Sequence, residues 1–154
     1  MATEDFVLNV TDQPSDDAET VIEGGLDRYN VSQAGHSDSR PLAVLITDPV
    51  TNAVVGGLLG RTTLGLFFVD LIFVPDALRG RGVGSRVLEA AEQEALRRDC
   101  TAVALYTISF QAPAFYARQG YRELGRIECD APGHTRFCMT KRLVPSLGPS
   151  QEAP

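Results

Sequence analysis

The chain has 154 residues, a net charge of −6, and 44% hydrophobic and 22% charged residues. A chain of this length and composition is most simply one soluble domain with one core. The acidic balance argues against a general nucleic-acid binder, which presents an excess of Lys and Arg to phosphates. Because no segment approaches the roughly 20 apolar residues of a membrane span, we expect neither a nucleic acid nor a membrane as partner.

The cysteines and histidines argue against a metal site. Cys100, Cys129 and Cys138 lack the spacing of metal ligands, and His36 and His134 lie far apart in the sequence. An odd number of cysteines without such a pattern fits a reducing compartment. The acidic N-terminal residues contain no apolar signal segment, so we expect a cytoplasmic protein. From the spacing of cysteines and histidines, we expect no bound metal.

The first predicted elements are a strand and a helix. Apolar and polar residues alternate over residues 5–12, which favours a strand. The segment that follows predicts a helix beginning near residues 15–17, where serine and aspartate side chains can cap it. We expect Gly24 and Gly25 to weaken or break this helix, because glycine has a low helix propensity.

A hairpin and a buried strand are predicted next. Residues 41–60 predict two strands around a turn that contains Pro and Asn. Residues 64–74, LGLFFVDLIFV, are almost continuously apolar and rich in β-branched and aromatic side chains. Such a run is typical of a central strand covered on both faces. Strand alternation would place Asp70, its only charged residue, on the same face as Ile72 and Val74.

The rest of the chain predicts two helices and three strands. In the first of these helices, Val87, Leu88, Ala91 and Ala95 recur at helical spacing, so this face should be buried. Periodicity and glycine or proline boundaries place the elements. They are a helix over residues 83–98, a strand over 101–108, a short helix over 113–119, and strands over 121–128 and 135–143 around a loop.

The expected fold class is therefore α/β (α+β), with the element order β-α-β-β-β-α-β-α-β-β. The strand–helix–strand segment from residue 66 to 108 should be a right-handed parallel crossover. Hairpins on either side of it make the central sheet mixed. We expect residues 1–144 to form a single domain and residues 145–154 to be a disordered tail.

The densest motif is the segment RGRGVGS, residues 79–85, between the buried strand and the helix. Glycines allow several backbone N–H groups to converge, and the following helix adds unpaired N–H groups and the positive end of its dipole. Together these features form an anion site suited to phosphate. Arg79 and Arg81 bring positive charge to it, and Ser85 can add a hydroxyl.

Two other phosphate-binding patterns do not fit this segment. The Walker pattern GxxxxGK[ST] requires a lysine that is absent. The dinucleotide pattern GxGxxG fails in both registers, because its third glycine would fall on Ser85 or on Val87.

Arg79-x-x-Gly82-x-Gly84, after a hydrophobic strand that ends in Val-Pro, resembles the acetyl-CoA-binding motif of the GNAT superfamily, the Gcn5-related N-acetyltransferases. A second segment, SFQAPAFYARQGYRELG over residues 109–125, resembles the family's later motif of a short helix carrying Phe-Tyr. The closing HTRFCMTKRL resembles the last strand of small, single-domain bacterial members. The resemblance covers residues 40–143 and implies a GNAT-like mixed sheet flanked by helices.

The resemblance also implies that acetyl-CoA is the acetyl donor. The end of the central strand would pair with the pantetheine arm, the glycine-rich loop would bind the pyrophosphate, and the later helix would approach the sulfur. Ser109 stands where many family members carry an asparagine, which puts a side-chain contact of that asparagine in doubt. The implied cofactor-binding residues are Ile72, Phe73, Val74, Arg79, Gly80, Arg81, Gly82, Val83, Gly84, Ser85, Ser109, Phe115 and Tyr116.

The implied reaction is direct attack of a neutral primary amine on the acetyl thioester in a ternary complex. The backbone N–H of Val74 is a candidate for polarising the thioester carbonyl. Tyr116 is the candidate proton donor to the departing thiolate, because its reference pKa of about 10 keeps it protonated at neutral pH. Asp70 and His134 are candidates for the base that removes the amine proton.

Other interpretations remain open at the level of sequence. The same loop would serve a catalytically silent acetyl-CoA-binding sensor or interaction module, and a nucleotide-dependent kinase or dehydrogenase is a third class. The acceptor stays open: a polyamine, an amino-sugar antibiotic, an amino acid and a protein amine are all compatible with the sequence. A homodimer is an expectation from the family.

Overall fold

The computed structural model describes residues 6–130 and 133–145. The chain divides into two compact units, residues 1–37 and residues 38–154. The predicted single domain over residues 1–144 stays a prediction. Residues 146–154 of the predicted tail lie outside the described residues, as do residues 131–132 of the loop between the last two strands.

The first unit is built around one helix, α1 (Asp16–Ala34). The Ser15 hydroxyl accepts a hydrogen bond from the Ala18 N–H, and three acidic residues occupy the first turn, so the predicted cap is confirmed. Gly24 and Gly25 do not break the helix, contrary to expectation. Two glycines cost the helix roughly 2 kcal/mol relative to alanine, which the cap and the other helix-favouring residues offset. The helix ends at Gly35, which has a left-handed backbone with φ 81°.

The strand predicted over residues 5–12 is wrong for the residues that the structure describes, since residues 6–12 adopt no strand. The apolar side chains that suggested it are exposed, and Val10 is fully so. A strand forms by pairing with a neighbour, and alternation alone supplies no such partner.

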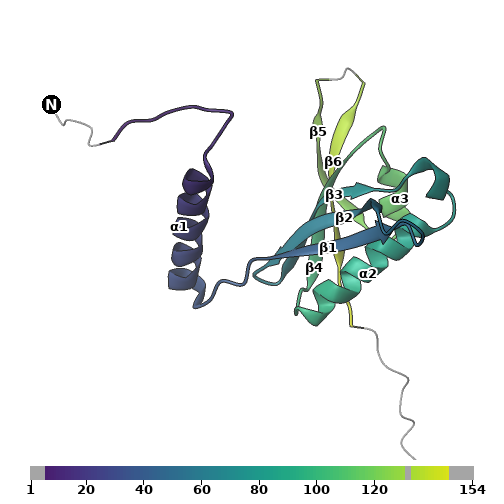
Figure 1. Cartoon of the computed structure of the whole chain (residues 1–154), viewed down its shortest axis with the longest axis horizontal. Helices are drawn as coiled ribbons and strands as arrows, with labels where there is room; N and C mark the ends of the chain where they lie inside the picture. The colour runs from purple at the N-terminus through teal and green to yellow at the C-terminus, as the bar shows by residue number, and fades with distance from the viewer. Residues whose placement is uncertain (1–5, 131–132, 146–154) are drawn as a thin grey trace, which may run out of the picture. The chain divides into compact units, whose positions relative to one another are not determined.

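The second unit is a mixed six-stranded sheet in the order β1-β2-β3-β4-β6-β5 (Figure 1). β3 and β4 are parallel and all other neighbours are antiparallel, so the predicted mixed fold class is confirmed. The expected element order differs only at the missing first strand. The strands are β1 (Arg40–Thr47), β2 (Val54–Thr63), β3 (Leu66–Phe73), β4 (Ala102–Ile108), β5 (Arg122–Glu128) and β6 (Thr135–Arg142).

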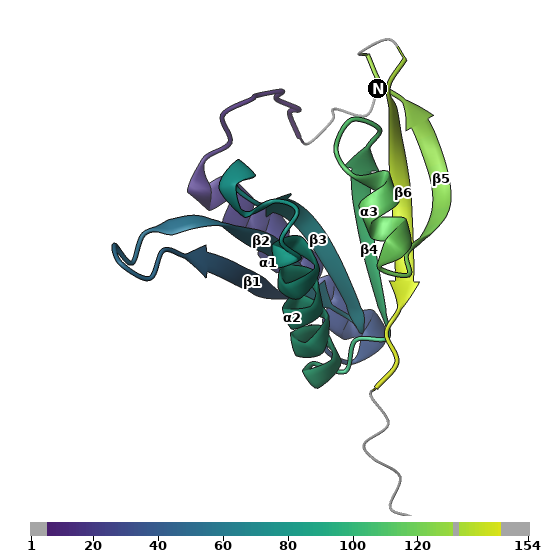
Figure 2. The same cartoon turned by 90° about the vertical axis from the view of Figure 1, so that its right-hand side faces the viewer.

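Two helices accompany this sheet, α2 (Val83–Arg97) and α3 (Pro113–Arg118). Figure 2 shows α2 beside the β1–β3 half and α3 beside the half formed by β4, β6 and β5. The predicted buried face of α2 is confirmed, because Val87, Leu88, Ala91 and Ala95 are all at most 5% exposed. They join Phe67 of β3 and Val103 of β4 in the hydrophobic core.

One buried polar network ties α2 to the C-terminal strands. Glu92 is 8% exposed, and its two carboxylate oxygens accept hydrogen bonds from the Tyr121 hydroxyl and from Lys141 Nζ, both at 2.8 Å. The ammonium of Lys141 also lies 5.6 Å from the centre of the Tyr121 ring. A buried carboxylate satisfied on both oxygens fixes the position of α2 against β6.

The sheet opens in its middle, and this opening positions the functional site. β3 and β4 pair only from Leu66 and Ala102 to Val69 and Leu105, although both strands continue beyond these residues. Figure 2 shows the two halves of the sheet diverging from this point. The backbone at the end of β3 therefore has a strand partner in β2 on one side and an open cleft on the other.

Candidate active site

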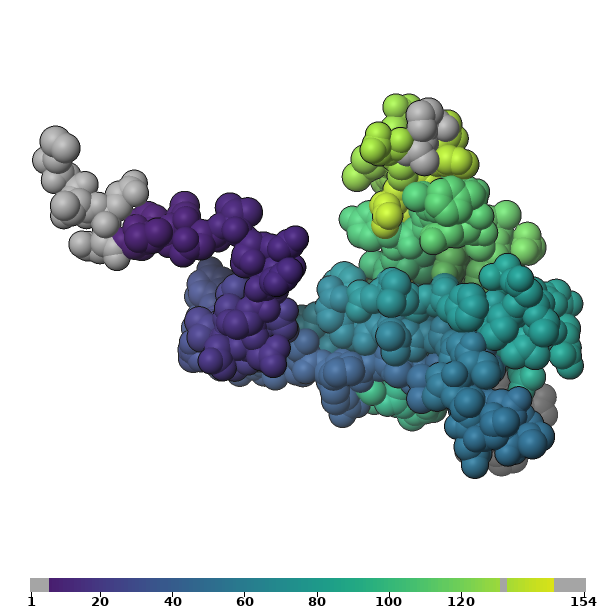
Figure 3. Space-filling model, turned by 45° about the horizontal axis from the view of Figure 1, so that its top comes forward, coloured from purple at the N-terminus to yellow at the C-terminus, as the bar shows by residue number. Residues whose placement is uncertain are grey.

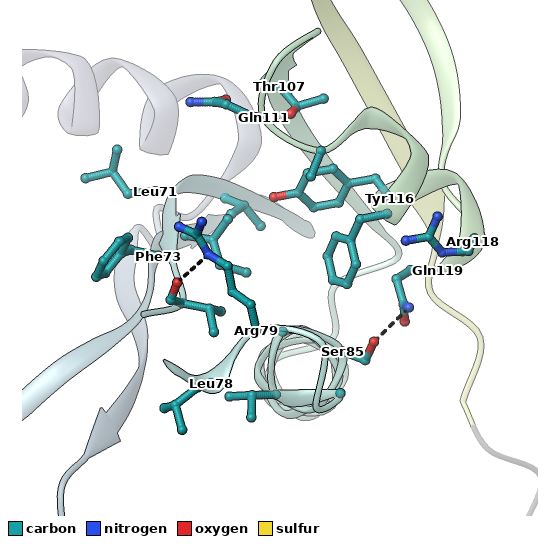
Figure 4. A pocket seen from close by; sticks show the side chains of 18 of the residues that line it. Leu71, Phe73, Leu78, Arg79, Ser85, Thr107, Gln111, Tyr116, Arg118 and Gln119 are labelled. Carbon is teal, nitrogen blue, oxygen red and sulfur yellow. Dashed lines mark hydrogen bonds between the residues drawn. The ribbon is translucent and has the colours of Figure 1, made fainter. Parts of the chain in front are cut away.

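The cleft between β3 and β4 is a cavity of about 860 Å³ (Figure 4). This volume lies in the range of sites that hold a cofactor or a drug-sized ligand. Its wall comes from two parts of the chain: residues 69–85, from β3 through the glycine-rich loop to the start of α2, and residues 106–119, from the end of β4 to the end of α3. The cavity brings together most of the residues predicted from the sequence. Those are Asp70, Ile72, Phe73, Val74, Arg79, Gly80, Gly82, Val83, Gly84, Ser85, Phe115 and Tyr116.

The glycine-rich loop forms the turn that leads into α2. Gly80 and Gly82 have φ values of 69° and 73°, the left-handed region in which glycine is unstrained. Gly82 is the N-cap of α2, so the first N–H groups of the helix follow it directly. A Cβ at Gly80 or Gly82 would meet nothing within 4 Å, which shows that this side of the loop is open to a ligand. The loop thus presents the N–H groups and the dipole that an anion requires.

Gly84 has a different role from the other two glycines. A Cβ at this position would lie 3.4 Å from the Phe115 ring of α3 and 3.8 Å from the Val74 side chain. Glycine here allows α3 and the end of β3 to approach the start of α2 closely. Phe115 packs against the hydrophobic core, so it forms part of the cavity wall from the core side.

Arg79 connects the loop to the end of β3. Its Nε donates a hydrogen bond to the Val74 carbonyl at 3.0 Å, and its Nη1 lies 2.7 Å from Asp76 Oδ1 in the 3-10 turn η1 (Asp76–Leu78). The guanidinium therefore holds the backbone from which the Val74 N–H also projects. Arg81, in contrast, is exposed and does not line the cavity.

Tyr116 comes from α3 and points its hydroxyl into the cavity, as Figure 4 shows. Its side chain is 4% exposed, and burial raises its pKa from 10.0 to about 12. The rings of Phe115 and Tyr121 hold it in edge-to-face contacts, with centroids 5.2 and 5.6 Å away. This position gives a protonated hydroxyl in a fixed direction.

Asp70 does not share a face with Ile72 and Val74, so this prediction from strand alternation is wrong. Val69 pairs with Gly60 and Leu71 with Leu59, which leaves Asp70 as the extra residue of a β-bulge. The bulge shifts the alternation by one residue. Ile72 consequently packs on the core, whereas the Asp70 carboxylate points the other way and accepts a hydrogen bond from Arg61 Nη1 at 2.6 Å.

Ser109 and His134 lie together outside the residues that line the cavity. The Ser109 hydroxyl is 3.1 Å from His134 Nδ1 and accepts a hydrogen bond from the Thr135 N–H at 3.1 Å. The His134 ring packs edge-on against Phe110, with 4.9 Å between centroids. Phe110 lines the cavity, whereas His134 and Ser109 are not among its lining residues. His134 directly precedes β6, in the loop that joins β5 to β6, and the β5–β6 end projects from the second unit in Figure 3.

Several cavity residues were not predicted from the sequence. Gln119 follows α3, and its Nε2 donates a hydrogen bond to Ser85 Oγ at 2.9 Å, which joins the end of α3 to the start of α2. Thr107 was detectable as a polar residue at a buried position of the apolar segment TAVALYTI. The others carry no local signal, because only the tertiary fold brings them to the cavity. They are Val69, Leu71, Leu78, Tyr106, Phe110, Gln111, Ala112 and Arg118.

Comparison with known proteins shows which family this chain belongs to. The model of the acetyltransferase (GNAT) family matches residues 10–121. The chain belongs to the GNAT family of acetyltransferases. It is 36% identical to an acetyltransferase of Agrobacterium fabrum over 138 residues, which cover 90% of this chain and 98% of that protein. It is also 37% identical to the blasticidin-S acetyltransferase of Streptomyces morookaense over 109 residues, which cover 69% of this chain and 80% of the relative.

Solved structures agree with this assignment. A crystal structure from Agrobacterium tumefaciens, assigned as an acetyltransferase, matches with a TM-score of 0.80 and 34% identity, covering 89% of this chain and 99% of that one. An aminoglycoside 6′-N-acetyltransferase complexed with coenzyme A matches with a TM-score of 0.57 and 18% identity, covering 68% and 74%, and so shows the shared fold. The sequence-based identification of the family and of an acetyltransferase is therefore confirmed.

Two further properties concern the described part of this GNAT chain. Among residues 6–130 and 133–145, no three His, Cys, Asp or Glu side chains gather as a metal site would need. Within the same residues, no helix combines the length and apolar character needed to cross a membrane.

Proposed function

We propose that the chain is an acetyl-CoA-dependent N-acetyltransferase that moves an acetyl group to a primary amine by direct attack in a ternary complex. The observation that carries this proposal is the cleft itself. It has a glycine-rich anion site at the start of α2, free strand backbone at the end of β3, and a buried tyrosine hydroxyl in its wall. Acetyl-CoA has an anion, an amide-bearing arm and a sulfur in the same order.

The residues present fit acetyl-CoA in three places. The loop from Arg79 to Ser85 would bind the pyrophosphate through its N–H groups, with the helix dipole behind them. Beyond Val69, β3 no longer pairs with β4. The pantetheine arm would take that place and pair with the backbone of Ile72, Phe73 and Val74. The donor, when bound, supplies an activated acetyl thioester whose carbonyl the Val74 N–H would polarise.

Tyr116 would protonate the leaving thiolate. Its hydroxyl faces the cavity, and its pKa of about 12 keeps the proton available at any physiological pH. Negative charge develops on the sulfur as the thiolate leaves. A proton donated by a nearby hydroxyl neutralises this charge and so lowers the barrier. The edge-to-face contacts with Phe115 and Tyr121 keep the hydroxyl in place during the reaction.

We place binding of the acceptor amine, and removal of its proton, at Asp70. Asp70 is the candidate base that lines the cavity, and its side chain is 49% exposed, so an incoming ammonium can reach it. Arg61 occupies one carboxylate oxygen and leaves the other available. We propose no proton transfer through His134, because it does not line the cavity.

We propose a small cationic amine as the acceptor class. One relative at 37% identity is named for acetylation of blasticidin S. The acidic net charge of −6 and the carboxylate of Asp70 at the cavity favour a cation over an anion. Cytoplasmic location and assembly as a homodimer, both expected from the sequence, remain predictions that cell fractionation and light scattering can check.

A thiol-release assay tests the proposed function. Purified protein is incubated with acetyl-CoA and each member of a panel: blasticidin S, spermidine, an aminoglycoside, an amino acid and a peptide. We expect enzyme-dependent release of CoA thiol with at least one small amine and none without an acceptor. Tight binding of acetyl-CoA without release across the panel would instead indicate a silent binding module. Stabilisation by nucleotides but not by acetyl-CoA would contradict the assignment of the cofactor.

A further inference from the structure

Thr107 carries a buried hydroxyl that the fold leaves unpaired. The residue is 2% exposed and lies near the end of β4, on the face that Val103 and Leu105 bury in the core. Within residues 6–130 and 133–145, Thr107 Oγ1 is the buried side-chain nitrogen or oxygen atom that has no hydrogen-bond partner. A hydroxyl in such a place lowers stability, so its presence calls for a function.

Two other threonines of this sheet with buried or partly buried hydroxyls, Thr62 and Thr140, are paired. Thr62 Oγ1 on β2 accepts a hydrogen bond from Arg98 Nη1 at 3.1 Å. Thr140 Oγ1 on β6 donates one to the Val103 carbonyl at 2.7 Å. The hydroxyls of these two threonines thus have protein partners within the fold. Thr107 differs from both in its position, because it alone of the three lines the cleft between β3 and β4.

The position of Thr107 in the cleft is specific. β4 leaves β3 after Leu105, so Thr107 is the next residue on the core-facing side of β4 beyond the point of separation. Figure 4 shows its side chain and that of Tyr116 in the same wall of the cavity. Rotation about χ1 exchanges its hydroxyl and its methyl group without changing the volume of the side chain. The hydroxyl can therefore turn toward a group that enters the cleft.

We propose that the Thr107 hydroxyl binds an amide of the pantetheine arm of acetyl-CoA. The assignment rests on the proposed function, which places that arm between β3 and β4. An amide offers both an N–H and a carbonyl, and a hydroxyl can donate to one or accept from the other. Apolar side chains such as Ile72, Val74 and Phe115 line the same cleft. In such surroundings one hydrogen bond sets the depth and register of the arm, and so the distance from the thioester to Tyr116.

The test uses Thr107→Val, which has nearly the same shape and lacks the hydroxyl. Because the hydroxyl has no partner in the free protein, we expect the Tm of the unliganded variant to equal or exceed that of the wild type. We expect its affinity for CoA, measured by isothermal titration calorimetry, to fall about 3- to 10-fold, as for one neutral hydrogen bond. Thr107→Ser, which keeps the hydroxyl, should restore most of that affinity.

A second probe separates the arm from the rest of the cofactor. Adenosine 3′,5′-bisphosphate has the nucleotide end of CoA and no pantetheine, so its affinity should be the same for wild type and Thr107→Val. Thr140→Val is the matched control, because it removes a paired hydroxyl from the neighbouring strand. It should lower the Tm and leave the affinity for CoA unchanged.

The outcomes are distinct. Wild-type affinity of Thr107→Val for CoA, or loss of folding in this variant, overturns the proposal. An equal loss of affinity for CoA and for adenosine 3′,5′-bisphosphate also overturns it, because the hydroxyl would then act through the shape of the whole site. If the wild-type protein itself binds no acetyl-CoA, the proposed function has failed, and that result is recognisable before any variant is made.

Discussion

Arg61 Nη1 donates a hydrogen bond to Asp70 Oδ1 at 2.6 Å across β2 and β3. The guanidinium also lies 5.0 Å from the centre of the Phe68 ring, so it is held from two sides. Both members of the ion pair are about half exposed, at 48% and 49%. Such a pair contributes little stability, roughly 1 kcal/mol at most. Its main effect is to fix the direction of a carboxylate at the edge of the cleft.

Asp70→Asn should therefore weaken acceptor binding without unfolding the protein. We expect KM for a cationic amine to rise about 10-fold, as for loss of one charge-assisted hydrogen bond, with the Kd of acetyl-CoA unchanged. Steady-state kinetics with the acceptor varied gives the first value, and calorimetry the second. Glu123→Gln, which breaks the exposed pair with Arg126 on β5, is the control and should leave KM alone. An unaltered acceptor KM in Asp70→Asn would remove Asp70 from the site.

Tyr116→Phe should reduce turnover and preserve binding of acetyl-CoA. Removing a general acid lowers kcat by roughly 10²-fold or more. The hydroxyl makes up a small part of the cavity wall, and the ring contacts with Phe115 and Tyr121 survive, so the Kd of acetyl-CoA should stay within about 2-fold of wild type, less than the cost of one hydrogen bond. Single-turnover kinetics isolates the chemical step. A variant with unchanged kcat would reject the role of proton donor.

The protein should lose stability at alkaline pH through two buried tyrosines. Burial raises the pKa of Tyr116 to about 12, and burial together with the Glu92 carboxylate raises the pKa of Tyr121 further. Both groups have a pKa near 10 in the unfolded chain, so the unfolded state loses these protons first as the pH rises. The stabilising contribution is complete below pH 10 and is lost as the pH rises toward and beyond 12.

Urea unfolding at a series of pH values between 7 and 11 measures this effect. Tyr121→Phe should flatten the alkaline part of the curve, because one of the two groups is gone. The same change leaves one oxygen of the buried Glu92 without its partner and should cost about 1–3 kcal/mol at pH 7. An alkaline slope identical in wild type and variant would contradict the role of Tyr121.

Gly82 allows a comparison of backbone strain with charge at the anion site. Its φ of 73° is tolerated best by glycine and next by asparagine or aspartate, and a Cβ there meets nothing within 4 Å. Gly82→Asp and Gly82→Asn are nearly isosteric, so they share the strain and differ in charge. We expect Gly82→Asp to lose affinity for acetyl-CoA by about 100-fold through repulsion of phosphate, and Gly82→Asn to lose much less. Equal affinities of the two variants would place the pyrophosphate elsewhere.

Much of the second unit could be predicted from the sequence because its signals are local. The apolar run before the 79–85 loop and the helical spacing from Val87 to Ala95 identify the strand and helix on either side. The bulge at Asp70 could not be predicted, because it arises from the register between β3 and β2. The pairing of Ser109 with His134 likewise depends on two segments that only the folded sheet brings together.

The N-terminal predictions failed because they relied on local signals alone. Alternation over residues 5–12 is a weak local signal that becomes a strand only when a neighbour supplies hydrogen bonds. The destabilising effect of Gly24 and Gly25 on the helix was overestimated. The cap at Ser15, at the start of the same helix, stabilises it against their low helix propensity. Local propensities decide an element when no larger free-energy term opposes them.

The most direct test of the central claim is the stoichiometry of acetyl transfer in a single reaction. Wild-type protein is incubated with acetyl-CoA and the amine that is active in the thiol-release assay. Free CoA thiol and N-acetylated amine are then quantified together by mass spectrometry. The proposed function predicts one acetylated amine for each thiol released, with both falling together in Tyr116→Phe. Thiol released without acetylated amine, or acetyl-CoA bound and never consumed by any amine, would contradict it.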